Sequence, residues 1–402
     1  GDDPKSRFIF DELANAAKRG VLVRLLIDAL SIPDSPRDLA RMARAHRNLE
    51  ICLYKPLSDL AKRGPFGFWD NLIFKAHHMN RRMHNKLLLI DGRVGIAGGR
   101  NCDGRYFDRN PDFLFRDRDV LVAGPAVTDM QDSFELFWQD KNAPFLTQLL
   151  DVQREFEKMT NGGEPLSHPN DYWMFEEIDR LANNTDPSSV RSSLKVYEAD
   201  AVRFIYDTPR KFRGGGAHKS FDRWFTSVLS KGELRLVYQT PYLIYNRDTR
   251  KSFKALRKAH PGFRIVASSN SLAASDHISA YALSFKHRKE LYKKTGIDIY
   301  EAKPYPRDQY QYIYALDCLI GRVVEEHVTG DGASVEDARR SGPRLCIHAK
   351  SFVLDGKAAL IGSHNFDPRS AKLNTECGLF IDDEEIAQVL EKAILNACEP
   401  QN

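Results

Sequence analysis

The sequence contains no apolar run that approaches the ~20 residues needed for a helix to span a bilayer. The best candidate, Val21 to Leu30, is interrupted by Arg24 and Asp28, and it predicts a buried strand instead. The beginning of the chain also lacks the apolar segment of a signal peptide. The net charge is only +4, so an attraction of the whole surface to nucleic acid would be weak and any basic patch must be local.

The six cysteines are scattered, and no two of them form a Cys-x-x-Cys pair. The sequence therefore gives no support for a zinc or redox motif. Cys346 and Cys377 lie within apolar runs and are predicted to be small core residues. With 402 residues, 42% hydrophobic and 28% charged, the composition is that of a globular protein long enough for two domains.

One long motif is present twice in the chain. Each copy has the form His-x-Lys-x4-Asp-x6-Gly-(Gly/Ser)-x-Asn. A single match would fix few positions, but two complete matches indicate an internal duplication and one active site built from two half-sites. The copies comprise His84, Lys86, Asp91, Gly98, Gly99 and Asn101, and His348, Lys350, Asp355, Gly362, Ser363 and Asn365.

The duplication extends to the segments that precede each motif, where helical patterns alternate with apolar runs. Alternation of this kind predicts an α/β fold in which each half has a mixed, mostly parallel sheet flanked by helices. We expect a first domain over 1–145, a helical connector over 146–198 and a second domain over 199–402. The expected helices are 8–19, 36–47, 248–259 and 279–295, and the expected strands are 21–27, 49–54, 263–267 and 297–300.

The two halves differ at one point. The second half begins with an additional strand, 234–239, which has no counterpart before the first helix of the chain. Either the sequence is a truncated version of a longer protein or the repeat is asymmetric. We favour truncation, because the loss of a central strand would leave an exposed sheet edge.

Each motif is predicted to form a hairpin. Asp91-Gly92 and Asp355-Gly356 each separate two apolar runs, which is a strong signal for a two-residue turn. The two motif aspartates are therefore expected to hold local structure and not to take part in chemistry. Because alternate residues of a strand share a face, the histidine and lysine of each copy project together, as is needed to present an imidazole and an ammonium to one phosphate.

The other polar residues of the motif suit phosphoryl transfer. Asn101 and Asn365 follow tight glycine-containing segments, and their amides are expected to bind phosphate oxygens beside the lysines. One histidine would attack phosphorus while the other protonates the leaving oxygen. The attacking histidine needs a carboxylate on its other ring nitrogen. The candidates are Glu376 in the second half and Asp117, with Asp119 as its competitor, in the first.

The paired motif resembles the signature of the phospholipase D superfamily, and the similarity spans essentially the whole chain. This resemblance implies two similar phospholipase D-like domains with one active site at their interface. It also implies two displacements through a phosphohistidine, without a metal or a cofactor. His84 and His348 would be the nucleophile and the general acid/base, with His84 as the nucleophile, and Lys86, Lys350 and the two asparagines would bind phosphate.

Flanking segments are similar to the bacterial cardiolipin synthase branch, and to its C type in particular: 80–87 (NRRMHNKL), 239–243 (QTPYL), 270–276 (NSLAASD) and 365–376 (NFDPRSAKLNTE). This similarity implies a phosphatidyltransferase that makes cardiolipin from phosphatidylglycerol with phosphatidylethanolamine or with a second phosphatidylglycerol. The alternatives are a phospholipase D-type hydrolase or a nuclease of the same superfamily, and the low net charge disfavours nucleic acid. A non-catalytic lipid-binding protein is disfavoured by the two intact motifs.

The resemblance also implies phospholipid substrates at a membrane surface, without an obligate partner for the site. The enzyme would be attached peripherally or by an anchor outside this sequence, at the inner membrane of a bacterium. Phe66, Phe68 and Trp69, which lie among basic residues, suit either insertion into an anionic surface or a core cluster. Arg81 and Arg82 either hold a second phosphate or headgroup, or are solvated charges.

Overall fold

The computed structural model describes residues 4–32, 35–56, 58–61, 80–108, 110, 112–162, 194–212, 220–245, 247–308, 343–400 and 402. The chain divides into two compact units, Gly1–Asn80 with Phe137–Glu198 (unit 1) and Arg81–Leu136 with Ala199–Asn402 (unit 2). Both copies of the motif lie in unit 2. The domain boundaries predicted from the repeat follow the duplication and stay a prediction.

Unit 1 contains the helices and strands predicted at the beginning of the chain. Its two strands pair in parallel, with Val23 opposite Leu49. Leu39, Leu53 and Leu149 belong to one buried cluster, which gathers the apolar sides of the strands and helices. The elements are α1 (Pro4–Lys18), β1 (Val23–Asp28), α2 (Pro36–Arg44), β2 (Leu49–Tyr54), η2 (Leu146–Gln148) and α6 (Leu150–Gly162).

Unit 2 is built on a seven-stranded sheet with the order β10-β9-β8-β12-β13-β14-β7. The strands β10, β9 and β8 run parallel, whereas every other pairing of this sheet within the described residues is antiparallel. The mixed sheet is confirmed, but its description as mostly parallel is wrong, because the motif hairpin and its neighbours add antiparallel strands. The strands are β7 (Ala201–Tyr206), β8 (Arg235–Gln239), β9 (Arg264–Asn270), β10 (Ile297–Ala302), β12 (Ser351–Leu354), β13 (Ala358–Gly362) and β14 (Cys377–Asp382).

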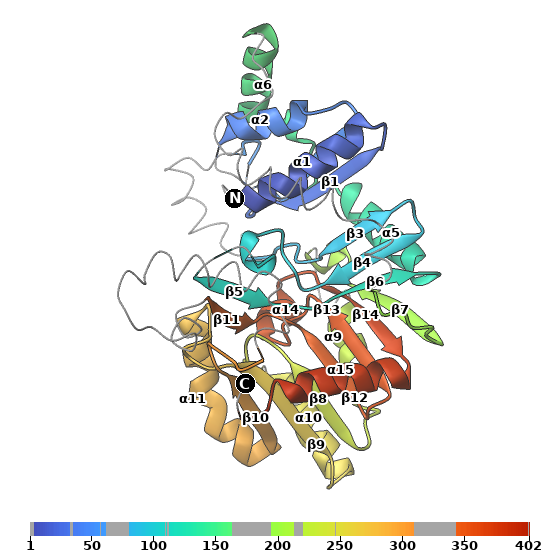
Figure 1. Ribbon diagram of the computed structural model, residues 1–402, viewed down its shortest axis with the longest axis vertical. Helices are drawn as coiled ribbons and strands as arrows, with labels where there is room; N and C mark the ends of the chain where they lie inside the picture. Colours follow the sequence, from blue (N-terminus) through green and yellow to red (C-terminus); the bar gives the residue numbers. More distant parts are fainter. Residues whose placement is uncertain are drawn as a thin grey trace, which may run out of the picture. The chain divides into compact units, whose positions relative to one another are not determined.

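Helices cover both faces of this sheet (Figure 1). α15 (Glu384–Asn396) packs on one face, where Leu390 and Ile394 meet Val353 and Ile361. The opposite face is covered by α9 (Ser220–Leu229), α10 (Arg247–Ala259) and α11 (Ile278–Thr295), whose buried side chains share a cluster with Phe352. The sheet is therefore buried on both sides, as expected for an α/β fold.

The first motif also folds in unit 2, as a three-stranded sheet with the order β3-β4-β6. Met130 of the following helix and Ala97 of β4 belong to the same buried cluster as Leu379 of β14, so the hairpin of the first half packs on the sheet of the second half. β5 of the first half pairs in parallel with β11 of the second. The elements are β3 (Leu87–Ile90), β4 (Val94–Gly98), β5 (Phe113–Arg116), β6 (Asp119–Ala123), α5 (Ala126–Trp138) and β11 (Arg344–Ile347).

Both hairpin turns have the predicted chemistry. Asp91 and Asp355 adopt φ values of 52° and 57°, and the glycine after each also has positive φ, as a type I′ turn requires. The pairing of Ile90 with Val94 and of Leu354 with Ala358 leaves three residues in each loop, one more than the predicted two. The Asp355 carboxylate in addition accepts three backbone N–H groups, from residues 233 to 235, at 2.8 to 2.9 Å. Asp355 therefore holds the local structure, as predicted.

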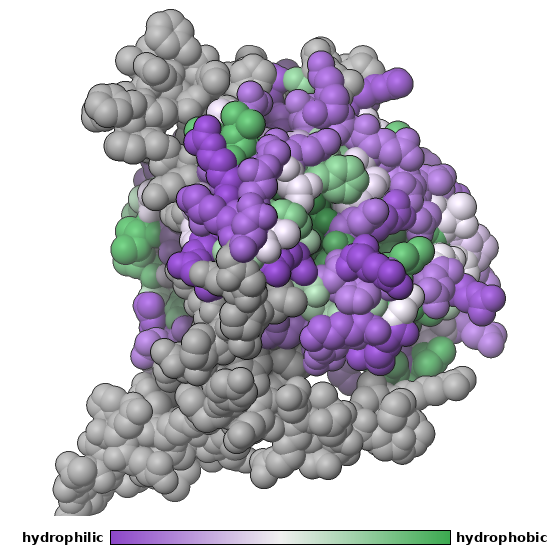
Figure 2. Space-filling model, turned by 90° about the horizontal axis from the view of Figure 1, so that it is seen from above, coloured by the Kyte–Doolittle hydropathy of each residue, from purple (hydrophilic) through white to green (hydrophobic). Residues whose placement is uncertain are grey.

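The face of the molecule in Figure 2 is mostly hydrophilic, and its hydrophobic residues form small separate groups. Among the described helices, none combines the length and the apolar character needed to cross a bilayer. The predicted aromatic cluster at Phe66, Phe68 and Trp69 lies outside the described residues. Cys346 and Cys377 are fully buried, which confirms that they are core residues.

Candidate active site

Each motif histidine is paired with a carboxylate of the other half of the sequence. Nδ1 of His84 lies 2.8 Å from Oε2 of Glu376, and Nδ1 of His348 lies 2.5 Å from Oδ2 of Asp117. Both predicted carboxylates are thus found against imidazoles, in a crossed arrangement. The two half-sites share their residues, so neither is complete without the other.

The backbone repeats the crossed arrangement. The N–H of His84 donates to the carbonyl of Thr375 at 3.0 Å, and the N–H of His348 donates to the carbonyl of Arg116 at 2.8 Å. In both cases the acceptor is the residue immediately before the carboxylate. Asp117 and Glu376 therefore occupy equivalent positions, which decides against Asp119 as the orienting carboxylate. Asp119 instead forms an ion pair with Arg100 at 2.6 Å.

The Gly-Gly and Gly-Ser segments bring the backbone close to these carboxylates. A Cβ on Gly99 would lie 2.3 Å from Oδ1 of Asp117, so that no larger residue fits there without displacing the carboxylate. The second copy has Ser363 at this position, and its hydroxyl donates to Oε2 of Glu376 at 2.5 Å. The Gly/Ser variation in the motif thus reflects two ways of placing a carboxylate beside an imidazole.

Burial and the lysines keep both imidazoles neutral at neutral pH. Burial is the main cause that lowers the pKa of His84, and burial together with the ammonium of Lys350 lowers the pKa of His348. The carboxylates behave oppositely: despite burial, Lys350 and His348 hold the pKa of Asp117 below its ordinary value, and His84 does the same for Glu376. An ionised carboxylate on Nδ1 requires that this nitrogen carry the proton, which leaves the lone pair on Nε2.

The lysines lie beside the histidines as predicted, but not on a strand as expected, because β3 begins after Lys86 and β12 begins after Lys350. Nζ of Lys86 donates to the backbone carbonyl of His84 at 2.9 Å. Nζ of Lys350 lies over the ring of His348, 2.6 Å from its Nδ1 and 2.9 Å from its Nε2, and also donates to that residue's carbonyl. Burial lowers the pKa of Lys350 to about 8. Two ammonium groups therefore adjoin the imidazoles, where an anionic phosphate would be stabilised.

The asparagines occupy different surroundings. Nδ2 of Asn101 donates to the hydroxyl of Tyr106 at 2.9 Å, and that hydroxyl lies 3.2 Å from Nε2 of His348. Tyr106 ends the short helix η1 (Gly104–Tyr106) and stacks on Phe115. Asn365 instead has a buried side-chain oxygen for which the described residues provide no hydrogen-bond partner.

A family model described as "Cardiolipin synthase, PLD-like domain" matches residues 5–138 and 321–397 of the chain. The chain belongs to this family. Cardiolipin synthase C of Escherichia coli (strain K12) is 33% identical over 399 residues, which are 98% of this chain and 77% of that protein. A probable cardiolipin synthase of Bacillus subtilis (strain 168) is 23% identical over 97% of this chain and 57% of its own length.

A solved structure supports the fold. The crystal structure of a phosphatidylserine synthase from Haemophilus influenzae covers 98% of this chain and 85% of its own, with a TM-score of 0.51 and 13% identity. At this identity the similarity concerns the fold alone. It agrees with the mixed α/β architecture and with the two segments that the cardiolipin synthase family model matches.

The site of this family member also depends on residues that the motif does not contain. Tyr106 has no signal in the sequence beyond an aromatic residue five positions after Asn101. Asp207 accepts the backbone N–H of Glu376 at 3.1 Å and forms a buried ion pair with Lys211 at 2.7 Å. Lys211 is itself buried, and its Nζ also donates to the carbonyl of Ser370 at 2.8 Å.

One of the two alternatives for Arg81 and Arg82 was that both are solvated charges. The structure does not agree with this alternative. Arg82 is buried, and its carbonyl accepts the N–H of Thr375 at 3.0 Å. Arg81 donates to the carbonyl of Phe212 at 2.5 Å, in the short helix η3 (Pro209–Phe212). Both residues thus help to hold the segment that leads into His84.

Proposed function

We propose that this protein is a phosphatidyltransferase that joins two phospholipids to form cardiolipin through a phosphohistidine intermediate. The observation that carries the proposal is the crossed pair of dyads, His84 with Glu376 and His348 with Asp117. Two oriented imidazoles on one phosphate are what a two-step displacement at phosphorus needs, since one attacks and the other transfers the proton. The membership in the cardiolipin synthase family supports a phospholipid as the phosphodiester.

In the first step, Nε2 of His84 attacks the phosphorus of a donor phospholipid. The bond between phosphorus and the headgroup oxygen breaks, and His348 gives a proton to that oxygen, so that glycerol or ethanolamine leaves. The side chain of His84 is 23% exposed and that of His348 only 9%, which favours His84 as the group that approaches phosphorus. Glu376 stabilises the positive charge that develops on the His84 ring.

In the second step, the terminal hydroxyl of phosphatidylglycerol replaces the departed headgroup. His348, now neutral, accepts the proton of this hydroxyl, and the oxygen attacks phosphorus while the bond to Nε2 of His84 breaks. The products are cardiolipin and the free histidine pair. Lys86 and Lys350 balance the phosphate charge in both transition states, and we assign Asn101 and Asn365 to its non-bridging oxygens.

The general acid takes up its proton from solvent when the substrate binds. With both histidines neutral, the two lysines and two carboxylates of the site balance each other. A phosphodiester monoanion adds one negative charge beside the imidazoles and raises their proton affinity. Binding of the donor therefore favours the imidazolium that the first step consumes.

The same intermediate would give phosphatidic acid if water replaced the lipid acceptor, so that transfer requires the acceptor to exclude water. We place the reaction at the surface of a bacterial inner membrane, where both lipid substrates are found.

The direct test incubates the purified protein with phosphatidylglycerol, alone and with phosphatidylethanolamine, and identifies the lipid products by mass spectrometry. Cardiolipin together with released glycerol or ethanolamine is expected. Phosphatidic acid as the main product would indicate a hydrolase. Cleavage of single-stranded DNA with inert lipids would overturn the lipid assignment.

A further inference from the structure

Helix α11 has a second apolar face that the described residues leave exposed. Of its 18 residues only Leu291 and Thr295 are buried, both in the last turns. Ile278, Phe285 and Tyr292, spaced by seven residues along one side of the helix, are 72%, 60% and 64% exposed. Single exposed apolar residues need no explanation, but a stripe of them along a whole helix indicates a binding surface.

This apolar stripe is bordered by positive charge. Lys286, Lys289 and Lys293 follow it along α11 and are exposed. The neighbouring helix α10 adds the exposed Lys251 and Lys254. Together α10 and α11 contain eleven Lys and Arg residues but two acidic ones, although the whole chain has a net charge of only +4. These helices therefore form a basic patch. It is local, as the low net charge of the whole chain requires of any such patch.

The charge is segregated across the sheet. α15, which covers the opposite face, has three glutamates and one lysine. The excess of Lys and Arg on α10 and α11 is therefore absent from α15, where Glu391 is buried and paired with Arg235. Such a distribution orients a protein toward an anionic surface, because attraction on one face is not matched on the other.

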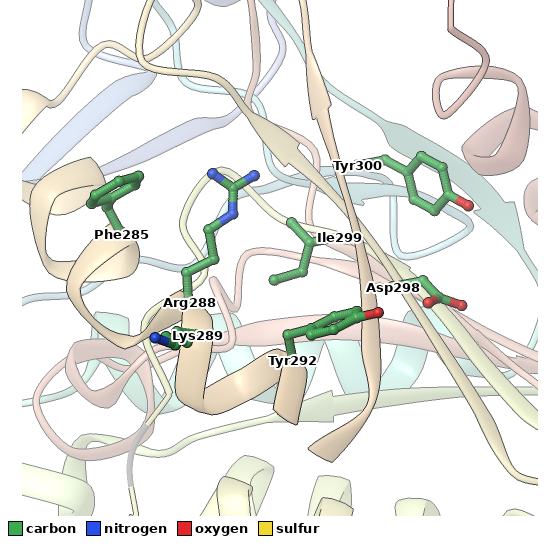
Figure 3. A pocket seen from close by; sticks show the side chains of 7 residues that line it. All are labelled: Phe285, Arg288, Lys289, Tyr292, Asp298, Ile299 and Tyr300. Carbon is green, nitrogen blue, oxygen red and sulfur yellow. The ribbon is translucent and has the colours of Figure 1, made fainter. Parts of the chain in front are cut away.

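A groove of about 670 Å³ lies between α11 and the edge strand β10. Its walls combine Phe285, Arg288, Tyr292 and Tyr300 with the carboxylate of Asp298 (Figure 3), and Arg288 pairs with Glu301 at 3.0 Å. Figure 3 shows the guanidinium of Arg288 between Phe285 and Ile299, so that a cation and aromatic rings line the same hollow. Tyrosines beside basic residues are typical of surfaces that meet the boundary between lipid headgroups and acyl chains.

The face is connected to β11, the strand that ends one residue before His348. The Asn270 side chain, at the end of β9, accepts the N–H of Ile347 at 2.7 Å and donates to its carbonyl at 2.8 Å. Asp276, two residues before α11, accepts the hydroxyl of Tyr242 at 2.9 Å. The segment that leads into α11 is thereby fixed against the strand that leads into the active site.

We propose that α11, with α10 and the groove beside β10, forms the surface by which this protein docks on an anionic phospholipid bilayer. The biological role of this surface rests on the proposed function, because only an enzyme that acts on lipids needs it. The physical reasons for membrane binding do not depend on that function. The lysines supply attraction to anionic headgroups, and the aromatic stripe enters the interface. The active-site strand then lies next to the lipid that it must take up.

The charge arm of the test uses Lys286→Gln, Lys289→Gln and Lys293→Gln combined. Cosedimentation is measured with vesicles of phosphatidylcholine, and with vesicles that also contain phosphatidylglycerol. We expect the wild-type protein to prefer the anionic vesicles, and the triple variant to bind them roughly a hundredfold more weakly, from about fivefold per lysine. Added salt should weaken the wild type more than the variant. Equal binding to both vesicles, or a triple variant that binds like the wild type, would overturn the proposal.

The apolar arm replaces the aromatic stripe, with Phe285→Ser and Tyr292→Ser. Its matched control makes the same kinds of change on the opposite face, with Val389→Ser and Lys392→Gln on α15, where both residues are exposed. The α11 variant should bind anionic vesicles at least tenfold more weakly, and the α15 variant as the wild type does. Loss of binding in both variants contradicts a specific surface, as does stronger binding to polyglutamate or single-stranded DNA than to vesicles.

The experiment also separates this inference from the function. His348→Ala should bind vesicles normally and lose turnover, so binding without cardiolipin formation by the wild type would refute the function alone. Conversely, the wild type could form cardiolipin from detergent-dispersed lipid while the α11 variants bind vesicles as strongly as the wild type does. This pair of results would refute the docking surface alone.

Discussion

The dyad between His84 and Glu376 makes the sharpest prediction. The Glu376 side chain is fully buried, and its Oε2 accepts from Nδ1 of His84 at 2.8 Å and from the hydroxyl of Ser363 at 2.5 Å. Glu376→Gln keeps the volume and removes the charge. The amide can also donate to Nδ1, which moves the ring proton to Nε2 and removes the lone pair needed for attack.

The magnitude follows from the charge that is lost. An ion pair about 4 Å apart in an effective dielectric of about 20 is worth about 4 kcal/mol. The His84 ring becomes positive only when it bonds to phosphorus, so most of this energy acts in the transition state. Since about 1.4 kcal/mol corresponds to a factor of ten, kcat should fall roughly a thousandfold in Glu376→Gln, with little change in KM.

The assay measures the steady-state rate of cardiolipin formation. In parallel, it measures the amount of labelled phosphohistidine in samples that are quenched without acid. Glu376→Gln should lower both, and His84→Ala with Glu376→Gln should be no worse than His84→Ala alone, because the dyad acts as a unit. The matched control is Asp119→Asn, which removes a partly exposed carboxylate paired with Arg100 and should cost less than about threefold. A Glu376→Gln enzyme within tenfold of the wild type, or additive losses in the double variant, would refute the dyad.

Four further outcomes are expected. Tyr106→Phe removes the hydroxyl beside the proton-transfer histidine and should lower kcat about tenfold at constant KM, whereas an unchanged kcat would exclude it from the proton path. Because burial lowers the pKa of Lys350 to about 8, kcat/KM should fall above about pH 8, and a flat profile to pH 10 would contradict this. Burial lowers the pKa of His364 to about 3, so below about pH 6.5 the unfolded state binds a proton that the native state does not, and this residue should contribute about 2 kcal/mol to the stability lost at pH 5. Urea titrations at pH 7 and 5 should therefore show a loss that is smaller by about this amount in His364→Phe. Gly99→Ala should lower kcat about a hundredfold by displacing the carboxylate of Asp117, while Gly262→Ala, where an added Cβ meets nothing within 4 Å, should be neutral in the same assay.

The local structure of the motif was predictable because its causes are local. The Asp-Gly turns require positive φ, and Asp91 and Asp355 have it. Each lysine lies beside its histidine as expected, although both pairs are just outside the strands where the alternation would act. The need for an orienting carboxylate selects Glu376 and Asp117. The crossing of these carboxylates between the halves was not predictable, because it depends on where β5 and β14 lie in space, and spacing along the chain does not contain that information.

The lack of spatial information in the sequence also explains the other differences between the predicted and the observed structure. The helix–strand alternation predicts parallel strands, and β8, β9 and β10 are parallel. The hairpin strands then join the same sheet, where their turns force antiparallel pairing. Tyr106 and Lys211 each have a partner near in the sequence, but they reach the site through His348 and Ser370, which are far away along the chain. Their positions follow from packing alone.

The crossed dyads explain how a duplicated motif can perform two different tasks. Equivalent backbone hydrogen bonds hold both histidines, so the duplication alone would give two identical groups. The differences lie in their contacts: Lys350 and Tyr106 adjoin Nε2 of His348, and the ring of His84 is more exposed. An imidazole that faces a hydroxyl and an ammonium suits proton transfer to an alcohol oxygen, and a more accessible one suits attack on phosphorus. Because each half supplies the carboxylate of the other, neither histidine can diverge without the partner half, and the two roles are divided within one shared site.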